Sequence, residues 1–164
     1  VFPYPIPCGP NAKAEVGEAR LRLEEGPPAR FDILVIDAFS SDSIPLHLLT
    51  VEAMGAYLRA VPPGGVILLH ISNRYITLEP MIAALARQHG LAARIRVDNP
   101  QDRTRLTPSA WVALSRDASQ VEQLAQARRD TPWDTLAYPA PRAWTDDYAS
   151  ILPYIQWGKL LGDL

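Results

Sequence analysis

The strongest structural signal in this chain lies at residues 31–37, whose sequence is FDILVID. The central residues are apolar and mostly β-branched, and they leave no polar face. That pattern is typical of a parallel strand covered by helices on both sides. We therefore predict a buried strand over residues 31–36. Asp37 then stands at its carboxyl end, where ligands bind in open parallel sheets.

The neighbouring segments alternate between helical and strand patterns. Upstream, a short strand over 13–16 and a helix over 19–25 are expected. Downstream we predict a helix over 45–61, a strand over 66–71, a helix over 79–89 closed by Gly90, strands over 91–97 and 110–114, and a helix over 119–129. Helical connections of this length favour parallel pairing. The fold class is therefore α/β, with a mostly parallel sheet and helices on both faces.

Length and composition limit the class of protein. The 164 residues are 48% hydrophobic and 21% charged, with a net charge of −2, which suits one domain with a sizeable core. We predict a proline-rich arm over 1–12, the α/β domain over 13–130, and a tail over 131–164 that packs on the domain. No basic stripe indicates nucleic-acid binding, and no apolar run is long enough to span a membrane.

Cysteine usage points to a reducing compartment. Cys8 is the only cysteine, so no internal disulfide can form, and no Cys/His spacing suggests a metal site. We therefore expect a cytoplasmic protein that binds no metal.

Polar residues gather where the strands are expected to end. Asp37 and Asp42 could together hold a diamine, and one of them could accept a proton from an attacking nitrogen. Equally, Asp37 could cap the following turn, and Asp42 the helix that begins near Pro45. His70, at the end of the second strand, is expected to be a satisfied core or rim histidine. The segment WTDDY at residues 144–148 either lines a pocket or anchors the tail, and we favour anchoring.

Four segments in the same order resemble one enzyme family. DAFSSDSIP at residues 37–45, preceded by Phe31 and Asp32, resembles the catalytic loop of spermidine synthases and their relatives. VGEAR at 16–20 is similar to their Gly-Asp-(Gly/Ala)-Arg turn. HISNRY at 70–75 and WTDDY at 144–148 resemble segments of a spermidine-synthase-like subgroup. The resemblance spans about residues 13–152 and implies a partial Rossmann-like methyltransferase fold.

The resemblance implies a transferase that acts in polyamine biosynthesis. An aminopropyl (or methyl) group would pass from an S-adenosyl nucleotide to a polyamine or other amine, with Asp37 as general base. Asp42 would bind an amine end of the substrate. The other implied substrate-binding positions are Ser40, Ser41, Tyr75 and Tyr148. Glu18 and Ala19 would lie on the adenine side of the nucleotide, although the family has Asp where this chain has Glu18.

One part of the family pattern is missing. The family's nucleotide site begins with a strand, a Gly-x-Gly-x-Gly turn and a helix, and no such turn precedes Gly17. We therefore expect these residues to match only the C-terminal part of the family and to bind no cofactor tightly. Decarboxylated S-adenosylmethionine or S-adenosylmethionine would serve as co-substrate if the missing half is supplied. The alternative is a catalytically inactive methyltransferase-fold domain that binds a partner protein or a small cation.

The missing first strand also bears on assembly. Without it, one edge of the strand over 31–36 keeps unpaired N–H and C=O groups, which invite pairing with another chain. The arm over residues 1–12 contains four prolines and a glycine, so it is a poor pairing strand. We therefore expect a homodimer, or a partner chain, at this edge.

Overall fold

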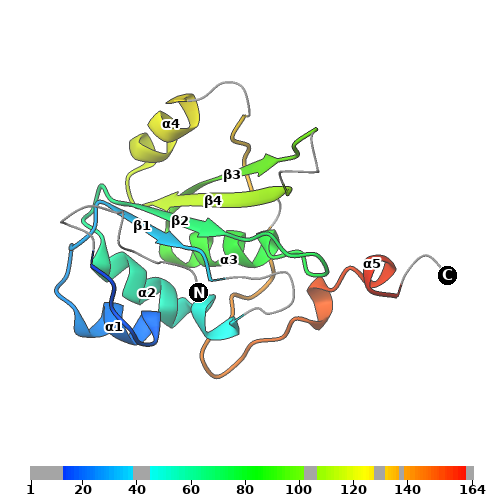
Figure 1. Ribbon diagram of the computed structural model, residues 1–164, viewed down its shortest axis with the longest axis horizontal. Coiled ribbons are helices and arrows are strands. Elements are labelled where there is room, and N and C mark those ends of the chain that lie inside the picture. The colour runs from blue at the N-terminus through cyan, green and yellow to red at the C-terminus, as the bar shows by residue number, and fades with distance from the viewer. Residues whose placement is uncertain (1–12, 39–44, 102–106, 128–131, 137–138, 162–164) are drawn as a thin grey trace.

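The computed structural model describes residues 13–38, 45–101, 107–127, 132–136 and 139–161, which form a four-stranded sheet with helices on both sides (Figure 1). The strands are β1 (Ile33–Ile36), β2 (Val66–His70), β3 (Ala92–Asp98) and β4 (Ser109–Ser115). The α-helices are α1 (Ala19–Glu25), α2 (Val51–Ala60), α3 (Glu79–His89), α4 (Ala118–Ala127) and α5 (Trp157–Leu161). Two 3₁₀ turns, η1 (Leu46–Leu48) and η2 (Leu152–Tyr154), complete the set.

The sheet is mixed, in the order β1-β2-β4-β3. β1 and β2 pair in parallel, whereas β4 is antiparallel to both of its neighbours. Three strands therefore run in one direction and β4 runs against them, so only one adjacent pair of strands is parallel. The sheet together with the helices on both of its faces confirms the α/β fold class. β4 runs antiparallel to β3 because the connection between them is too short for a helical crossover. The strands that share a direction, β1, β2 and β3, are joined by helical crossovers.

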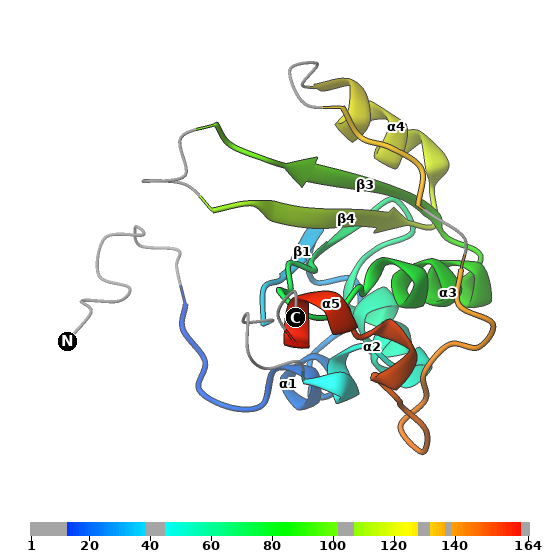
Figure 2. The same cartoon turned by 90° about the vertical axis from the view of Figure 1, so that its right-hand side faces the viewer.

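The two faces of the sheet are covered unequally. Helices α1 to α3 lie on one side and α4 on the other (Figures 1 and 2). The α2–α3 face carries the core, including Ile67 and Leu69 at 0% exposure. On the opposite face α4 covers β3 and β4, but Ile33 and Val35 of β1 are 60% and 51% exposed. Burial of β1 on both faces, expected from its sequence, is thus wrong for the described chain, because no helix of the described residues lies over that part of the sheet.

Element boundaries follow local capping signals. α3 has the predicted bounds, and Gly90 closes it at φ 64°, with its N–H donating to the carbonyls of Ala86 and Arg87. The helix expected over 45–61 is instead the turn η1 followed by α2. The break lies at Thr50, whose Oγ1 accepts a hydrogen bond from Ala53 N–H at 3.1 Å, as an N-cap does. Residues 13–16 form no strand.

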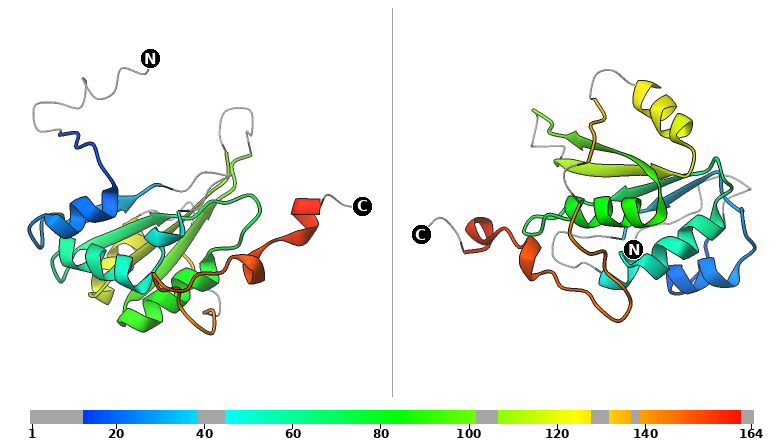
Figure 3. Two further views of the ribbon diagram at one scale, coloured as in Figure 1. Left: turned by 90° about the horizontal axis from the view of Figure 1, so that it is seen from below. Right: turned by 180° about the vertical axis from the view of Figure 1, so that it is seen from behind.

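The tail is fastened across the helical layer before it runs outward. Trp144 is 2% exposed, meets Tyr154 edge-on at 5.8 Å, and accepts a hydrogen bond at its carbonyl from Val51 N–H. Arg20 holds both carboxylate oxygens of Asp146, at 2.8 and 2.7 Å. Beyond these contacts, α5 extends away from the sheet (Figure 3).

Candidate functional site

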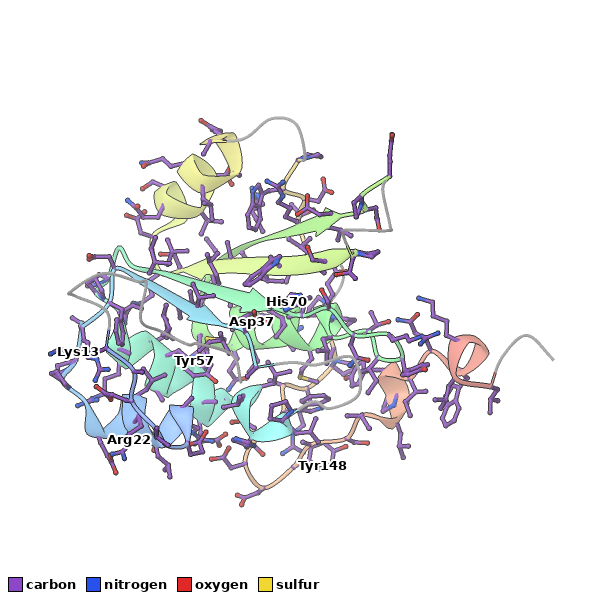
Figure 4. All side chains as sticks on the ribbon, viewed as in Figure 1. Lys13, Arg22, Asp37, Tyr57, His70 and Tyr148 are labelled. Atoms are coloured by element: carbon purple, nitrogen blue, oxygen red, sulfur yellow. The ribbon has the colours of Figure 1, made fainter. Side chains whose placement is uncertain are left out.

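The site forms where β1 and β2 end side by side. The pairing of Ile36 with Leu69 places the next residues, Asp37 and His70, next to each other at the carboxyl ends of two parallel strands. Asp37 Oδ1 lies 2.6 Å from His70 Nδ1, and the two side chains point toward each other in Figure 4. The carboxylate side chain is 58% exposed and the imidazole 20%, so the carboxylate is the group that a ligand can reach.

A second layer of contacts fixes the imidazole. His70 Nε2 lies 2.6 Å from Ser72 Oγ, and that oxygen accepts a hydrogen bond from Ala110 N–H at 2.7 Å. The ring of Trp111 on β4 stacks on the imidazole, with 4.6 Å between centroids and 19° between planes. The histidine is therefore held at both ring nitrogens and on its flat side.

The register of the sheet explains this grouping. His70 pairs with Trp111, and Trp111 pairs with Arg96 on β3. With Asp37, these side chains form a row across all four strands, on the face that bears the exposed Ile33 and Val35. A carboxylate at the end of such a row can bind an ammonium group or accept its proton.

The residues expected to bind substrate are only partly placed. Ser40, Ser41 and Asp42 lie outside the described residues. Tyr75 is half-buried, in a turn held by hydrogen bonds from Tyr75 N–H and Ile76 N–H to Asn73 Oδ1, both at 2.9 Å.

Tyr148 lies in a different region. It occupies a turn of the tail, 51% exposed, with the Arg142 guanidinium 4.8 Å above its ring. Figure 4 places it apart from Asp37 and His70. The structure thus does not bring Tyr148 to the end of β1. In the same segment, Trp144 anchors the tail, as we expected from the sequence.

Glu18 acts as a helix cap. Its carboxylate accepts hydrogen bonds from Leu21 N–H at 2.8 Å and Arg20 N–H at 3.0 Å, at the start of α1. The bond from Leu21 is the largest cause of the lowered pKa of Glu18, because it stabilises the charged form. Ala19 follows as the first, exposed residue of α1.

Asp146 belongs to the fastening of the tail. Its hydrogen bonds with Arg20, joined by one from Thr50 Oγ1 at 2.7 Å, hold the pKa of Asp146 below its usual range, and the Arg20 contact is the largest cause. Because Thr50 also caps α2, the cluster joins α1, the start of α2 and the tail. The carboxylate of Asp146 therefore has a structural role, which is to hold the tail to these two helices.

Sequence reasoning missed His70 and Trp111 as parts of the site, whereas Ser72 belongs to a polar cluster that it placed at the end of the second strand without giving it a role. His70 was expected to be a satisfied rim histidine, and its ring is indeed hydrogen-bonded, but to the candidate base itself. The one available signal was that two buried strands, FDILVID and VILLH, each end on a titratable residue. Trp111 gave no signal, because its place depends on β4 inserting between β2 and β3.

Two absences hold for the described residues. Across them, no three His, Cys, Asp or Glu side chains gather closely enough to bind a metal ion. No helix in this part of the chain has the length and apolar character that a membrane crossing requires.

Comparison with known proteins gives a likeness in fold. No protein-family model matches the chain, and no curated protein matches it. Among solved structures, the chain is similar to a probable spermidine synthase from Corynebacterium glutamicum ATCC 13032, with a TM-score of 0.54 and 15% sequence identity. The match covers 83% of this chain and 55% of that one, so the chain spans about half the length of the solved relative. The fold is therefore spermidine-synthase-like, that is, a partial Rossmann-like methyltransferase fold.

Proposed function

We propose that this chain is the amine-binding part of a spermidine-synthase-like transferase, with Asp37 as general base. One observation carries the proposal: an exposed carboxylate stands at the carboxyl ends of two parallel strands, held there by an imidazole. That is where ligands bind in open α/β sheets. The chain's fold is also similar to part of the fold of the probable spermidine synthase.

In the proposed reaction Asp37 takes a proton from the ammonium group of the acceptor. The neutral nitrogen then attacks the propyl carbon bound to the sulfonium of decarboxylated S-adenosylmethionine. A nitrogen–carbon bond forms, the carbon–sulfur bond breaks, and the sulfur leaves as the uncharged thioether of methylthioadenosine. Ser40, Ser41, Asp42 and Tyr75 are proposed to hold the rest of the amine.

The chain is proposed to act together with a further polypeptide segment that supplies the nucleotide site. The chain contains no Gly-x-Gly-x-Gly turn before Gly17. Ile33 and Val35 leave an apolar part of the sheet exposed beside Asp37, and such surfaces usually mark an interaction site. A covering layer there would also exclude water from the reacting amine.

Alone, the chain is expected to bind S-adenosyl nucleotides weakly or not at all, because no glycine turn lets the backbone approach the ligand closely. Isothermal titration calorimetry with S-adenosylmethionine, its decarboxylated form and methylthioadenosine measures this directly. We expect dissociation constants above about 1 mM. A micromolar constant, about −8 kcal/mol, would show that the chain carries a complete nucleotide site.

The outer edge of β1 is proposed as the place where another chain pairs. Within the described residues β2 is the only strand beside β1. A groove of about 760 Å³ runs along this edge. It is lined by Lys13, Glu15, Gly17, Ala19, Arg22, Leu23, Pro27, Arg30, Phe31, Leu34, Val35 and Ile36. In isolation, a second copy is proposed to pair with this edge across a two-fold axis.

The purified chain is therefore expected to be a dimer at tens of micromolar in sedimentation equilibrium. Val35→Lys places a charge on the pairing strand and is expected to give a monomer. Val97→Lys is the matched control, because Val97 is a similarly exposed valine (48%) on the strand at the opposite edge, and it should leave the dimer intact. A monomeric wild type whose β1 amides resist hydrogen exchange would contradict the dimer and indicate that residues before Lys13 pair with β1.

A second function is a catalytically inactive domain that binds a small cation or a partner protein. The role of Glu18 favours it, because both carboxylate oxygens accept backbone hydrogen bonds at the start of α1 rather than standing free for an adenine. The two functions differ in one measurable way. A silent domain binds putrescine or its partner but supports no transfer, even when a nucleotide-binding half is supplied.

A further inference from the structure

The imidazole of His70 lies between two oxygen atoms, each 2.6 Å from a ring nitrogen. One oxygen belongs to the carboxylate of Asp37 and the other to the hydroxyl of Ser72. The hydroxyl already accepts a hydrogen bond from Ala110 N–H, and it has one proton of its own to donate. The positions of the protons follow from these contacts.

In a neutral imidazole one nitrogen carries the proton and the other accepts. With the proton on Nδ1, His70 donates to Asp37 and accepts from the Ser72 hydroxyl, so every contact joins a donor to an acceptor. With the proton on Nε2, the Nδ1 lone pair would face the carboxylate oxygen at 2.6 Å, which is repulsive. The contacts therefore place a proton on Nδ1, in the neutral ring and in the doubly protonated ring alike.

We propose that His70 is a positioning residue. Its Nδ1–H donates a hydrogen bond to Asp37 Oδ1 and so holds the carboxylate with its exposed part directed toward an ammonium group. The identity of the ligand rests on the proposed function. Charge-assisted hydrogen bonds of this kind are the stronger ones in proteins. Asp37 needs such support, because it lies one residue beyond the last paired residue of β1 and its side chain is 58% exposed.

The support continues into the sheet. Ala110 of β4 fixes Ser72, Ser72 fixes the imidazole, and Trp111 limits rotation of the ring by stacking on it. The contacts therefore run from β4 through β2 to β1. A carboxylate held in this way is oriented before its ligand arrives, which lowers the entropic cost of binding.

Ser72, His70 and Asp37 are also the residue types of an acyl-transfer triad. In such a triad the serine hydroxyl is the group presented to the substrate. Of these three residues it is Asp37 whose side chain is the more exposed end of the hydrogen-bonded group, whereas Ser72 Oγ accepts a hydrogen bond from the backbone N–H of Ala110 on the neighbouring strand. The geometry thus favours a carboxylate that the histidine holds in place for a ligand. A nucleophilic Ser72 is the alternative, and the experiments below include a test that would detect it.

The first measurement is the ring tautomer, from long-range ¹H–¹⁵N correlation spectra of the purified chain. His89 is the internal reference, because its Nε2 lies 3.1 Å from the carbonyl oxygen of Val51 and should carry the proton. His70 is expected to show the proton on Nδ1 and His89 on Nε2. An Nε2–H form of His70 would overturn the proposal.

The second measurement is the affinity for putrescine, monitored through the same spectra during a titration. His70→Asn keeps an N–H donor close to the position of Nδ1, so its affinity should stay within about threefold of wild type. His70→Ala removes the donor and should weaken binding about tenfold or more, the scale of a hydrogen bond to a charged group. Asp37→Ala should abolish binding, and His89→Asn is the control for loss of a histidine elsewhere. Wild-type affinity in His70→Ala would overturn the positioning role.

The two proposals can fail separately. If the wild-type chain does not bind putrescine, the proposed amine function is wrong, and the tautomer still decides whether His70 holds Asp37. Incubation with a fluorophosphonate probe tests the third possibility. We expect no labelling, whereas covalent modification of Ser72 would make the serine a nucleophile and overturn the role assigned to His70.

Discussion

Trp144→Ala is expected to lower the free energy of unfolding by about 3–5 kcal/mol, the usual cost of removing a large buried aromatic side chain. Trp144 is 2% exposed and belongs to the core cluster with residues of α2 and α3. Its removal leaves a cavity and also loosens the tail that crosses these helices. Chemical denaturation followed by circular dichroism gives the change in midpoint, from which the free energy is obtained.

Trp157→Ala is the matched control for that experiment. Trp157 begins α5 and is 51% exposed, so its loss should change the free energy of unfolding by no more than about 0.5 kcal/mol. The difference between the two variants isolates burial from residue type. A Trp144→Ala variant within about 1 kcal/mol of wild type would show that the tail contributes little to the stability of the domain.

Features set by near neighbours in the sequence were predictable. The bounds of α1 and α3 agree with the structure, because α1 ends before Gly26 and Pro27, and α3 closes at a glycine with positive φ. β1 was identified from its own apolar run. The break at Thr50 was missed, because an N-cap threonine inside an apolar helical pattern is a weak signal beside the periodicity around it.

Features set by distant neighbours were not predictable. Strands over 91–97 and 110–114 were expected in a mostly parallel sheet, and nothing local showed that β4 would enter between β2 and β3 against their direction. That insertion brings Trp111 onto His70 and Ala110 to Ser72. Asp37 was found from its place at a strand end, whereas its partner was not, because pairing His70 with Asp37 requires the register of β1 on β2, which the strand-end positions alone do not give.

The role of Glu18 shows a different limit. The resemblance of VGEAR to a nucleotide-contacting turn drew attention to this carboxylate. The structure shows it accepting the first N–H groups of α1. Both roles place an acidic residue just before a helix, so the sequence pattern alone could not separate them.

Asp37→Asn is expected to lower the turnover number by about two to four orders of magnitude, the usual span for a lost general base. Asparagine has nearly the same shape and can still accept a hydrogen bond from His70 Nδ1–H, so the fold and the placement of the side chain should survive. It cannot take a proton from the amine, however, so the acceptor nitrogen stays protonated and does not attack. The assay follows methylthioadenosine released from decarboxylated S-adenosylmethionine and putrescine, with the chain expressed together with the segment proposed to supply the nucleotide site.

Asp32→Asn is the matched control, since Asp32 is an exposed aspartate at the opposite end of the same strand, just before β1, away from the proposed reaction. It should leave turnover unchanged within about twofold, and both variants should unfold at the wild-type midpoint. A large loss in Asp37→Asn alone then reflects proton transfer and not folding. Turnover within about threefold of wild type, far short of the loss expected for a base, would reassign Asp37 to capping the turn after β1. Its hydrogen bond to His70 would then serve only the structure of the sheet's edge.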